Sequence, residues 1–398
     1  MFEPFIKPLH ILNTLHKNGH EAYFVGGAVR DLLLKRPIGD VDIATSALPG
    51  EVMELFPRTL DVGIEHGTVI VLIERTPYEV TTFRTEEGYE DYRRPKSVSF
   101  IKSLSEDLKR RDFTMNAIAM DTKGTLIDPY HGQEAINENL IETVGDPQER
   151  FTEDALRMMR GIRFVSQLGF SLGQSTKDAM MKNGYLLKEI SIERITKEFE
   201  KMITGSHAAK GLLLLLDTDL YKYLPNLEGA GDSLSKMAKY RWDSITTKTE
   251  AWVLFSFLLT IESLKSFLKM WKLPNKQMNE IIKNVRGLNA VLKDGWTIEV
   301  LYELGLNDAL QVERVRSILT SEDVLINLDK IQVQYNFLPI KTRAELVVNG
   351  NDLLNWAKEK PGPWVSMYLT EIEKKIVTNE LQNDRASIKE WFFRCKLK

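Results

Sequence analysis

The chain has 398 residues, of which 43% are hydrophobic and 27% are charged, and its net charge is −3. These values suit a folded protein of roughly two to four domains and exclude a wholly disordered chain. The single cysteine, Cys395, excludes an internal disulfide framework and a cysteine-rich zinc module. We expect a cytoplasmic protein, because the N-terminal segment lacks the clean apolar core of a signal peptide and Ala251–Ile261, the longest apolar stretch, is too short to span a bilayer.

The first 145 or so residues predict an α+β head with a small mixed sheet. Short runs of β-forming residues, bounded by Gly, Pro, Asp or charged residues, alternate there with helical patterns. The β-like runs are Ala22–Val25, Gly67–Glu74, Tyr78–Phe83 and Ala117–Asp121, and the helical patterns are Ala28–Leu34 and Pro49–Leu55.

The segment Tyr23–Asp31 predicts a strand, a pair of glycines and the start of a helix. Gly26 and Gly27 would let the backbone approach a phosphate closely, and the helix start would present free N–H groups to it. Arg30 would lie in the first turn as a phosphate partner. An ordinary strand-to-helix turn has the same pattern, so the glycine pair by itself does not establish a phosphate-binding turn.

Two carboxylates, Asp40 and Asp42, follow within Gly39–Thr45. In a strand they project to the same side, where like charges repel unless a cation lies between them. Oxygen ligands of this kind favour Mg²⁺ bridged to substrate phosphates. Glu79, the single acid of the β-like run Tyr78–Phe83, is the expected third carboxylate. An isolated Asp-x-Asp pair is more often a solvated strand edge, so the interpretation depends on the glycine pair before it.

Beyond the head, the pattern changes. Arg84–Pro95 is polar and poor in aliphatic residues, which predicts a mobile loop. From Glu149 onward, apolar residues recur at helical spacing, which predicts an all-α remainder. The helical segments are Glu153–Gln167, Ser175–Asn183, Ser191–Ile203, Ala208–Leu216, Lys248–Leu268 and Lys276–Leu292.

Four motifs occur in a fixed order, namely Gly26–Asp31, Gly39–Asp42, Arg110–Ala117 and Glu153–Arg160. Together they resemble the bacterial class II CCA-adding enzymes, tRNA nucleotidyltransferases of the polymerase-β-like superfamily. A later stretch, Val348–Leu354 with Pro361–Pro363, is similar to the tail of Gram-positive members. The resemblance implies a nucleotidyltransferase head (1–146) followed by an all-α neck that recognises the base (147–206), an all-α body (207–300) and an all-α tail that binds tRNA (301–398).

The activity that this resemblance implies is template-independent addition of C, C and A to the 3′ end of tRNA, with CTP and ATP as substrates. The implied partner is the acceptor end of tRNA with its adjoining helix, without a membrane or a stable protein partner. Asp40 and Asp42 match the metal-binding pair of the family. The positions that match its nucleotide-binding residues are Gly27, Arg30, Arg111, Asp154, Arg157, Arg160 and Arg163.

These residue types suit nucleotidyl transfer. Two Mg²⁺ ions held by Asp40, Asp42 and Glu79 would clamp the attacking and leaving oxygens. Arg30, Arg111 and the amides of Gly26 and Gly27 would neutralise the triphosphate.

Base choice is expected to rest on Asp154 and Arg157, which are neighbours if they lie on one helix. Their carboxylate and guanidinium match the amino group and ring acceptor that cytosine and adenine share, and mismatch uracil and guanine. The three arginines at 157, 160 and 163 would form a basic arc, although most charge runs of this kind are solvated helix faces.

Two further expectations concern supporting segments. In the family, a flexible loop at the place of Arg84–Pro95 is associated with the adenosine step, so its presence favours A addition. Ser191–Phe199 is similar to the last neck motif, where we expect Ser191 to cap a bracing helix and Arg194 to pair with Glu198.

Three alternatives stay open from the sequence. The first is an enzyme that adds only A, or a poly(A) polymerase of the same superfamily. The second is a small-molecule nucleotidyltransferase, which has no need of the long helical region. The third is a catalytically silent RNA-binding protein, against which the intact Asp40, Asp42, Arg111, Asp154 and Arg157 argue.

Overall fold

The computed structural model describes residues 3–90 and 94–396, without the side chains of residues 86–97. It divides into two compact units, residues 1–238 and 239–398. The predicted division into head, neck, body and tail is finer than these two units and stays a prediction. Within the described ranges, no helix combines the length and the apolar character that crossing a membrane requires.

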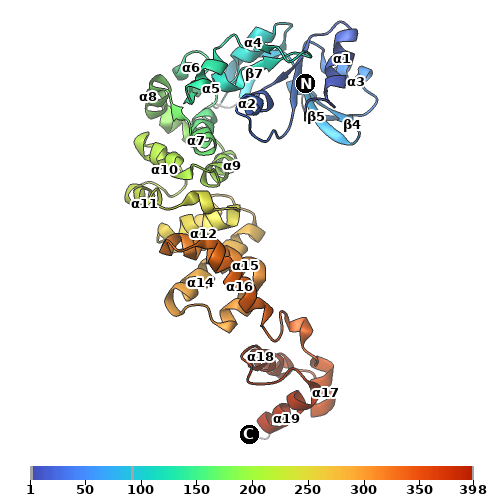
Figure 1. Ribbon diagram of the computed structural model, residues 1–398, viewed down its shortest axis with the longest axis vertical. Coiled ribbons are helices and arrows are strands. Elements are labelled where there is room, and N and C mark those ends of the chain that lie inside the picture. The colour runs from blue at the N-terminus through green and yellow to red at the C-terminus, as the bar shows by residue number, and fades with distance from the viewer. Residues whose placement is uncertain (1–2, 91–93, 397–398) are drawn as a thin grey trace. The chain divides into compact units, whose positions relative to one another are not determined.

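Within the described residues, the first unit contains a seven-stranded mixed sheet in the order β3-β4-β5-β2-β1-β8-β9 (Figure 1). β2 and β5 run parallel, whereas the other neighbours in this sheet are antiparallel. The α+β head is confirmed, with β1, β4, β5 and β8 at the predicted runs. The strands are β1 (Ala22–Val25), β2 (Asp42–Thr45), β3 (Thr59–Gly63), β4 (Thr68–Ile73), β5 (Thr76–Thr82), β8 (Ala119–Met120) and β9 (Leu126–Ile127).

The register of the central strands positions the acidic residues. Asp42 opens β2 and lies opposite Val25, the last residue of β1. On the other side of β2, Ile43 pairs with Val80 in parallel register, which aligns Asp42 with Glu79. Aligned residues of neighbouring strands point to the same face, so Asp42 and Glu79 share one face of the sheet.

Helices of the head cover the sheet and connect its strands. The predicted helices are confirmed as α2 (Gly27–Leu33) and α3 (Pro49–Leu55). Val25, Phe83, Leu108 and Ala117 belong to one buried cluster, which anchors the segment carrying the Arg110–Ala117 motif against the sheet. The other head helices are α1 (Leu9–Lys17), α4 (Leu104–Lys109), the 3₁₀ turn η2 (Thr114–Asn116) and α5 (Gly132–Asn137).

The expectation of a loop over Arg84–Pro95 is wrong for most of that segment. β6 (Arg84–Glu90) and β7 (Arg94–Phe100) form an antiparallel ribbon, with Thr85 opposite Ser99. A sequence pattern detects strands through the alternation of apolar and polar residues, which this polar segment lacks. Residues 91–93 lie outside the described residues, so the expected mobility and the role in adenosine addition stay predictions there.

The rest of the first unit is mainly helical, as predicted. The helix expected over Glu153–Gln167 is present as α7 but begins only at Leu156, because Asp154 and Ala155 separate it from α6, which ends at Glu153. The helices are α6 (Pro147–Glu153), α7 (Leu156–Leu168), α8 (Gln174–Asn183), α9 (Ile192–Ile203), α10 (Ala208–Asp217) and α11 (Gly231–Met237). A short parallel pair of strands, β10 (Leu140–Ile141) with β11 (Ser171–Leu172), joins the end of the predicted head to the helical region that follows it.

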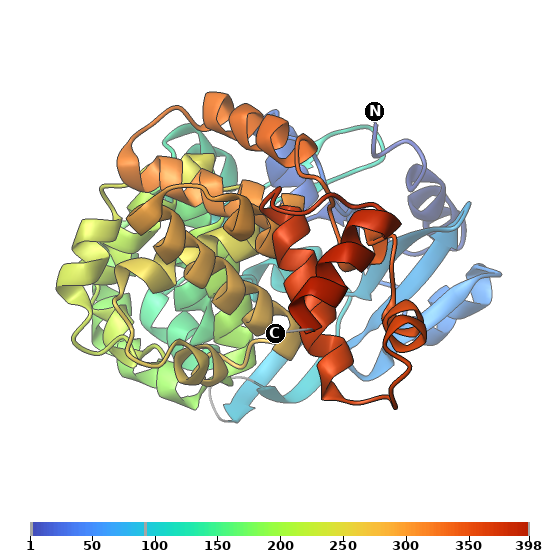
Figure 2. The same ribbon diagram turned by 90° about the horizontal axis from the view of Figure 1, so that it is seen from below.

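The second unit confirms the all-α remainder within its described residues. The helix expected over Lys248–Leu268 is divided at Thr260, whose φ of 52° is not helical. Trp252 and Trp271 are fully buried and in edge-to-face contact. The helices are α12 (Lys248–Leu258), α13 (Leu264–Met270), α14 (Asn275–Asp294), α15 (Ile298–Thr320), α16 (Val324–Asn336), α17 (Gly350–Ala357), α18 (Pro363–Val377) and α19 (Arg385–Lys396). The last three, in red in Figure 2, share a core that contains Leu353, Ile376 and Phe392.

Candidate active site

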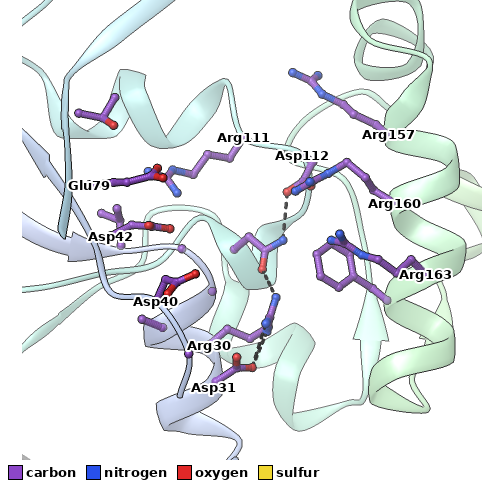
Figure 3. A pocket seen from close by; sticks show the side chains of 18 of the residues that line it. Arg30, Asp31, Asp40, Asp42, Glu79, Arg111, Asp112, Arg157, Arg160 and Arg163 are labelled. Carbon is purple, nitrogen blue, oxygen red and sulfur yellow. Dashed lines mark hydrogen bonds and ion pairs between the residues drawn. The ribbon is translucent and has the colours of Figure 1, made fainter. Parts of the chain in front are cut away.

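A cavity of about 790 Å³ in the first unit gathers every residue that the sequence singled out for chemistry. Asp40, Asp42 and Glu79 lie on one side of it, and the arginines of α7 follow one another along the opposite side (Figure 3). Basic side chains outnumber acidic ones in its lining, which suits a polyanionic ligand. The predicted residues that line it are Gly26, Gly27, Arg30, Asp40, Asp42, Glu79, Arg111, Asp154, Arg157, Arg160 and Arg163.

The carboxylates form a strained electrostatic cluster around Asp42. Burial raises the pKa of Asp42 to about 6, the negative charges of Glu79 and Asp40 act in the same direction, and Arg111 opposes them. Within the described residues, no group of three or more Asp, Glu, His or Cys side chains is arranged to hold a metal ion by itself. A cation in this place would therefore complete its coordination with oxygens from a substrate or from water.

At Gly26 the backbone passes close to both the guanidinium of Arg111 and the carboxylate of Asp42. Its φ of 72° lies in the left-handed region that glycine adopts readily. A Cβ atom built on Gly26 would lie 3.1 Å from Nη1 of Arg111 and 3.7 Å from Oδ2 of Asp42. Any larger residue would fill the narrow space between the chain, the guanidinium and the carboxylate.

Asp107, a residue the sequence interpretation did not assign, holds the arginine pair at 110 and 111. Its side chain is 1% exposed, and its oxygens lie 2.8 Å from Nη2 of Arg110 and 3.4 Å from Nη2 of Arg111. Burial alone would raise the pKa of Asp107, but the two guanidinium groups hold it below its usual value. The carboxylate therefore stays ionised and keeps Arg111 turned toward the cavity.

A second chain of contacts runs across the cavity from α2 to α7. Arg30 donates to Oδ1 of Asn116 at 2.7 Å, and Asn116 donates to Oδ1 of Asp112 at 3.1 Å. Oδ2 of Asp112 accepts a hydrogen bond from Nε of Arg160 at 2.7 Å. In Figure 3, dashed lines join Asp31 to Arg30 and continue from Arg30 to Asp112, beside which Arg160 lies. It ties the glycine turn to the arginine arc.

The predicted arginine arc is present on α7, but its members are anchored rather than solvated. Arg157 donates to Glu153 at 2.6 Å and to the carbonyl of Arg110 at 3.0 Å. Arg163 forms a buried ion pair with Glu198 of α9 at 2.8 Å. Its guanidinium also lies 4.2 Å from the centre of the Phe164 ring. These contacts exclude the interpretation of α7 as a freely solvated charged face.

Asp154 and Arg157 are not neighbours on one helix, which corrects the geometry expected from their spacing. Asp154 has an extended backbone, with φ −138° and ψ 103°, in the break between α6 and α7. Its Oδ1 accepts the N–H of Leu156 at 3.1 Å, a local bond that competes with continuous helix. Both residues still line the cavity.

The expected pair between Arg194 and Glu198 is also wrong, because each binds a residue near α7 instead. Nη2 of Arg194 donates to Oδ2 of Asp154 at 3.0 Å, while Glu198 pairs with Arg163. The expected bracing role of α9 is thus realised through contacts between helices. Ser191 occupies the N-cap position of α9, but its side chain makes no capping hydrogen bond there.

Comparison with known proteins places this architecture in a family. The model of the poly A polymerase head domain matches residues 22–142, and that of the probable RNA and SrmB-binding site of polymerase A matches residues 169–230. The tRNA nucleotidyltransferase domain 2 model matches residues 243–392. A CCA-adding enzyme of Geobacillus sp. is 52% identical over all of this chain and 98% of its own length.

The chain belongs to the CCA-adding enzyme family. The crystal structure of the Bacillus stearothermophilus CCA-adding enzyme in complex with CTP matches it with a TM-score of 0.93 and 48% identity, over 100% of this chain and 98% of the other. A CCA-adding enzyme of Thermotoga maritima complexed with tRNA shares the fold, with a TM-score of 0.64 and 18% identity over 100% of this chain and 97% of the other.

Sequence reasoning missed the acids and the amide that hold the arginines of the cavity. Asp107, Asp112 and Asn116 are each less than 9% exposed and each bonds to an arginine of the cavity. For Asp112 the sequence did offer a signal, because it directly follows Arg110 and Arg111. Burying such charges is costly unless opposite charges compensate them, so an ion pair could have been expected here. The partners at long range, such as Arg160 for Asp112, have no local signature.

Replacing Gly26 with Ala should impair nucleotide binding far more than it impairs folding. The added methyl group would press on Arg111 and stand beside Asp42, and the positive φ would add strain of about 1 kcal/mol. We expect the dissociation constant for CTP, measured by calorimetry, to rise at least about tenfold.

Gly124→Ala is the matched control for this substitution. Gly124 has a φ of 87° but open space around its Cβ position. It should lose a similar amount of stability and keep its CTP affinity. Equal CTP affinities in the two variants would show that the space at Gly26 is not needed.

The stability that Asp112 contributes should depend on pH. Burial opposes its ionisation, but Arg160, Asn116 and the N–H of Phe113 lower the pKa of Asp112 to about 2 in the folded protein. A folded pKa below the ordinary 3.8 means that the contribution is complete above about pH 4 and is lost as the pH falls toward 2. The difference corresponds to about 2 kcal/mol.

Asp112→Asn should therefore destabilise the first unit by about 2 kcal/mol or more at pH 7, with a smaller deficit near pH 3. Urea unfolding followed by circular dichroism measures this difference. All seven tryptophans lie in residues 239–398, so the tryptophan fluorescence transition reports the second unit and should not move. A deficit that is the same at both pH values would contradict the linkage.

Proposed function

We propose that this protein adds C, C and A to the 3′ end of tRNA, from CTP and ATP, with release of pyrophosphate. The observation that carries the proposal is the convergence of four separated motifs on one cavity, in a chain of the CCA-adding enzyme family that spans nearly the full length of its relatives. A head alone would suit many nucleotidyltransferases. The match of residues 243–392 to a tRNA nucleotidyltransferase domain supports tRNA as the acceptor.

The carboxylate side of the cavity is the proposed place of bond formation. Asp40 and Asp42 would hold Mg²⁺, with Glu79 as the third acid. The clustered hard oxygens and the raised pKa of Asp42 fit a divalent cation, since a positive charge relieves the repulsion among the acids. When bound, the metal would lower the pKa of the primer 3′-hydroxyl and stabilise the pyrophosphate leaving group.

The chain's own cations would position the triphosphate beside these acids. Arg111, fixed by Asp107, lies against the Gly26 turn, and Arg30 lies one turn along α2. Guanidinium groups bind phosphate oxygens with two parallel donors and keep their charge at any working pH. Held in place before substrate arrives, they would not need to reorganise as charge develops on the leaving group.

The opposite side of the cavity is the proposed site of base choice. Asp154, held by Arg194, would accept from the amino group of cytosine or adenine, and Arg157 would donate to the neighbouring ring acceptor. Uracil and guanine present a carbonyl to Asp154 and an N–H to Arg157. Each reversal leaves a polar group unpaired at about 1–3 kcal/mol, which gives strong discrimination when two occur together.

The alternatives from the sequence make different use of this architecture. A poly(A) polymerase or an enzyme that adds only A would share the head, but the relatives that match the entire chain are CCA-adding enzymes. A small-molecule enzyme would leave residues 239–398 without a use. A silent RNA-binding protein would have no reason to bring like-charged carboxylates together around Asp42.

Primer extension on labelled tRNA transcripts tests the proposed function. Transcripts lacking the terminus, ending in C or ending in CC would each receive CTP, ATP, UTP or CTP with ATP, with Mg²⁺. We expect two C additions, then one A and arrest, and no incorporation after chelation of the metal. Addition of A only to the CC-ended transcript, or long A tails, would refute the proposal in favour of the first alternative.

Asp154→Ala should loosen base choice more than it weakens triphosphate binding. The variant removes the acceptor for the amino group but leaves Arg30 and Arg111 in place. We expect the ratio of kcat/KM for CTP to that for UTP to fall about tenfold or more, the effect of one unpaired polar group. Arg194→Met is the companion variant, since it removes the holder but keeps the acceptor, and a smaller fall is expected. An unchanged ratio in Asp154→Ala would refute base reading by this residue.

A further inference from the structure

Asn116 occupies a junction in the cavity that no substrate-facing role explains. It ends the turn η2 and is 6% exposed. Its Oδ1 accepts Nη1 of Arg30 at 2.7 Å, and its Nδ2 donates to Oδ1 of Asp112 at 3.1 Å. Both polar ends of the amide are thus engaged by protein partners.

The two partners define the orientation and the chemistry of this amide. Arg30 can only donate, and ionised Asp112 can only accept, so a side chain between them must do both. A carboxylate at position 116 would face Asp112 with a like charge. An aliphatic side chain would deprive Nη1 of Arg30 of this acceptor and Oδ1 of Asp112 of one of its donors, in a buried place. Asparagine meets both demands with little side-chain entropy to lose.

Each partner of Asn116 continues to a group of the active site. The remaining donors of Arg30, Nε and Nη2, bind Oδ1 of Asp31 at 3.0 and 2.9 Å, which holds this guanidinium from its other side. At the far end, Oδ2 of Asp112 binds Nε of Arg160 at 2.7 Å and its Nη2 at 2.5 Å. The chain therefore joins α2, beside the carboxylates, to the centre of α7.

We infer that Asn116 is a positioning residue, which sets the distance between the triphosphate-binding arginine on α2 and the arginine arc on α7. This inference rests on the proposed function, because it concerns how one nucleotide is held at both ends. The base is read near the start of α7 and the phosphates lie at the Gly26 turn, so the spacing between the two helices decides whether both ends fit together. Asn116 is the neutral side chain that connects Arg30 on one side to Asp112 and Arg160 on the other.

Asn116→Leu tests the inference because leucine has the same number of side-chain heavy atoms in the same branched arrangement and no hydrogen-bonding group. Losing two hydrogen bonds that hold ground-state binding groups should raise KM for both CTP and ATP about tenfold, with kcat changed less than about twofold. A merely structural loss would lower the active fraction and hence kcat, at unchanged KM. Asn116→Asp, which sets a carboxylate against Asp112, should raise both KM values further.

Asn183→Leu is the matched control. Asn183 is a buried amide of the same unit, whose Nδ2 binds Gln148 at 2.7 Å and the carbonyl of Ala179 at 2.9 Å, and it does not line the cavity. It should lose stability and keep both KM values. The inference is overturned if Asn116→Leu leaves both KM values within twofold of wild type, or if Asn183→Leu raises them equally.

Equilibrium binding separates this inference from the proposed function. Calorimetric titration of CTP into wild type, Asn116→Leu and Asn183→Leu needs no tRNA and no turnover. We expect about tenfold weaker binding in Asn116→Leu alone. That result would stand even if wild type failed to extend tRNA, whereas equal binding by the three proteins would refute the inference however well wild type extends tRNA.

Discussion

The repulsion among carboxylates around Asp42 is the constraint on which the cavity depends. Asp42 is partly buried, and its pKa is raised by burial and by the charges of Glu79 and Asp40. Such a cluster is stable only when cations compensate it, and the chain supplies one of them in Arg111. Arg111 in turn needs Asp107, whose carboxylate is 1% exposed and also binds Arg110. Acidic and basic side chains therefore alternate from Asp42 through Arg111 to Asp107 before any substrate is present.

Ion pairs between acidic and basic side chains also hold α7 and α9 in place beside the cavity. Asp112 pairs with Arg160, Glu198 with Arg163, and Asp154 with Arg194. The pair between Arg163 and Glu198 is buried on both sides, and removing one partner of such a pair leaves an uncompensated charge and costs about 3–5 kcal/mol, so it holds α7 against α9. The other two pairs are partly exposed and contribute less. A rigid arrangement would suit the proposed choice of base by hydrogen bonds, because selectivity requires groups that do not move to accept the wrong partner.

Local sequence patterns predicted helices and strands well where the residues of one segment were sufficient to determine its structure. β1 and α3 have the predicted bounds, and the glycine turn has the left-handed backbone that Gly26 permits. The predictions were wrong where a side chain competed with its own backbone, as at Asp154, or where pairing used polar strands, as in β6 and β7. Arg194 and Glu198 illustrate a third cause, since their spacing suits a helical pair but stronger partners are available on another element.

The sequence by itself singled out the residues that line the cavity and that we propose carry the chemistry. Glycines, paired acids and arginines at these spacings have few uses together, and each type follows from the charge or backbone freedom that the reaction requires. Only the tertiary structure decided how they cooperate, because contacts such as that between Asp112 and Arg160 join segments 48 residues apart. The register of β2 with β5 and the junction at Asn116 arise in the same way, from packing and charge compensation between distant segments, for which no local pattern exists.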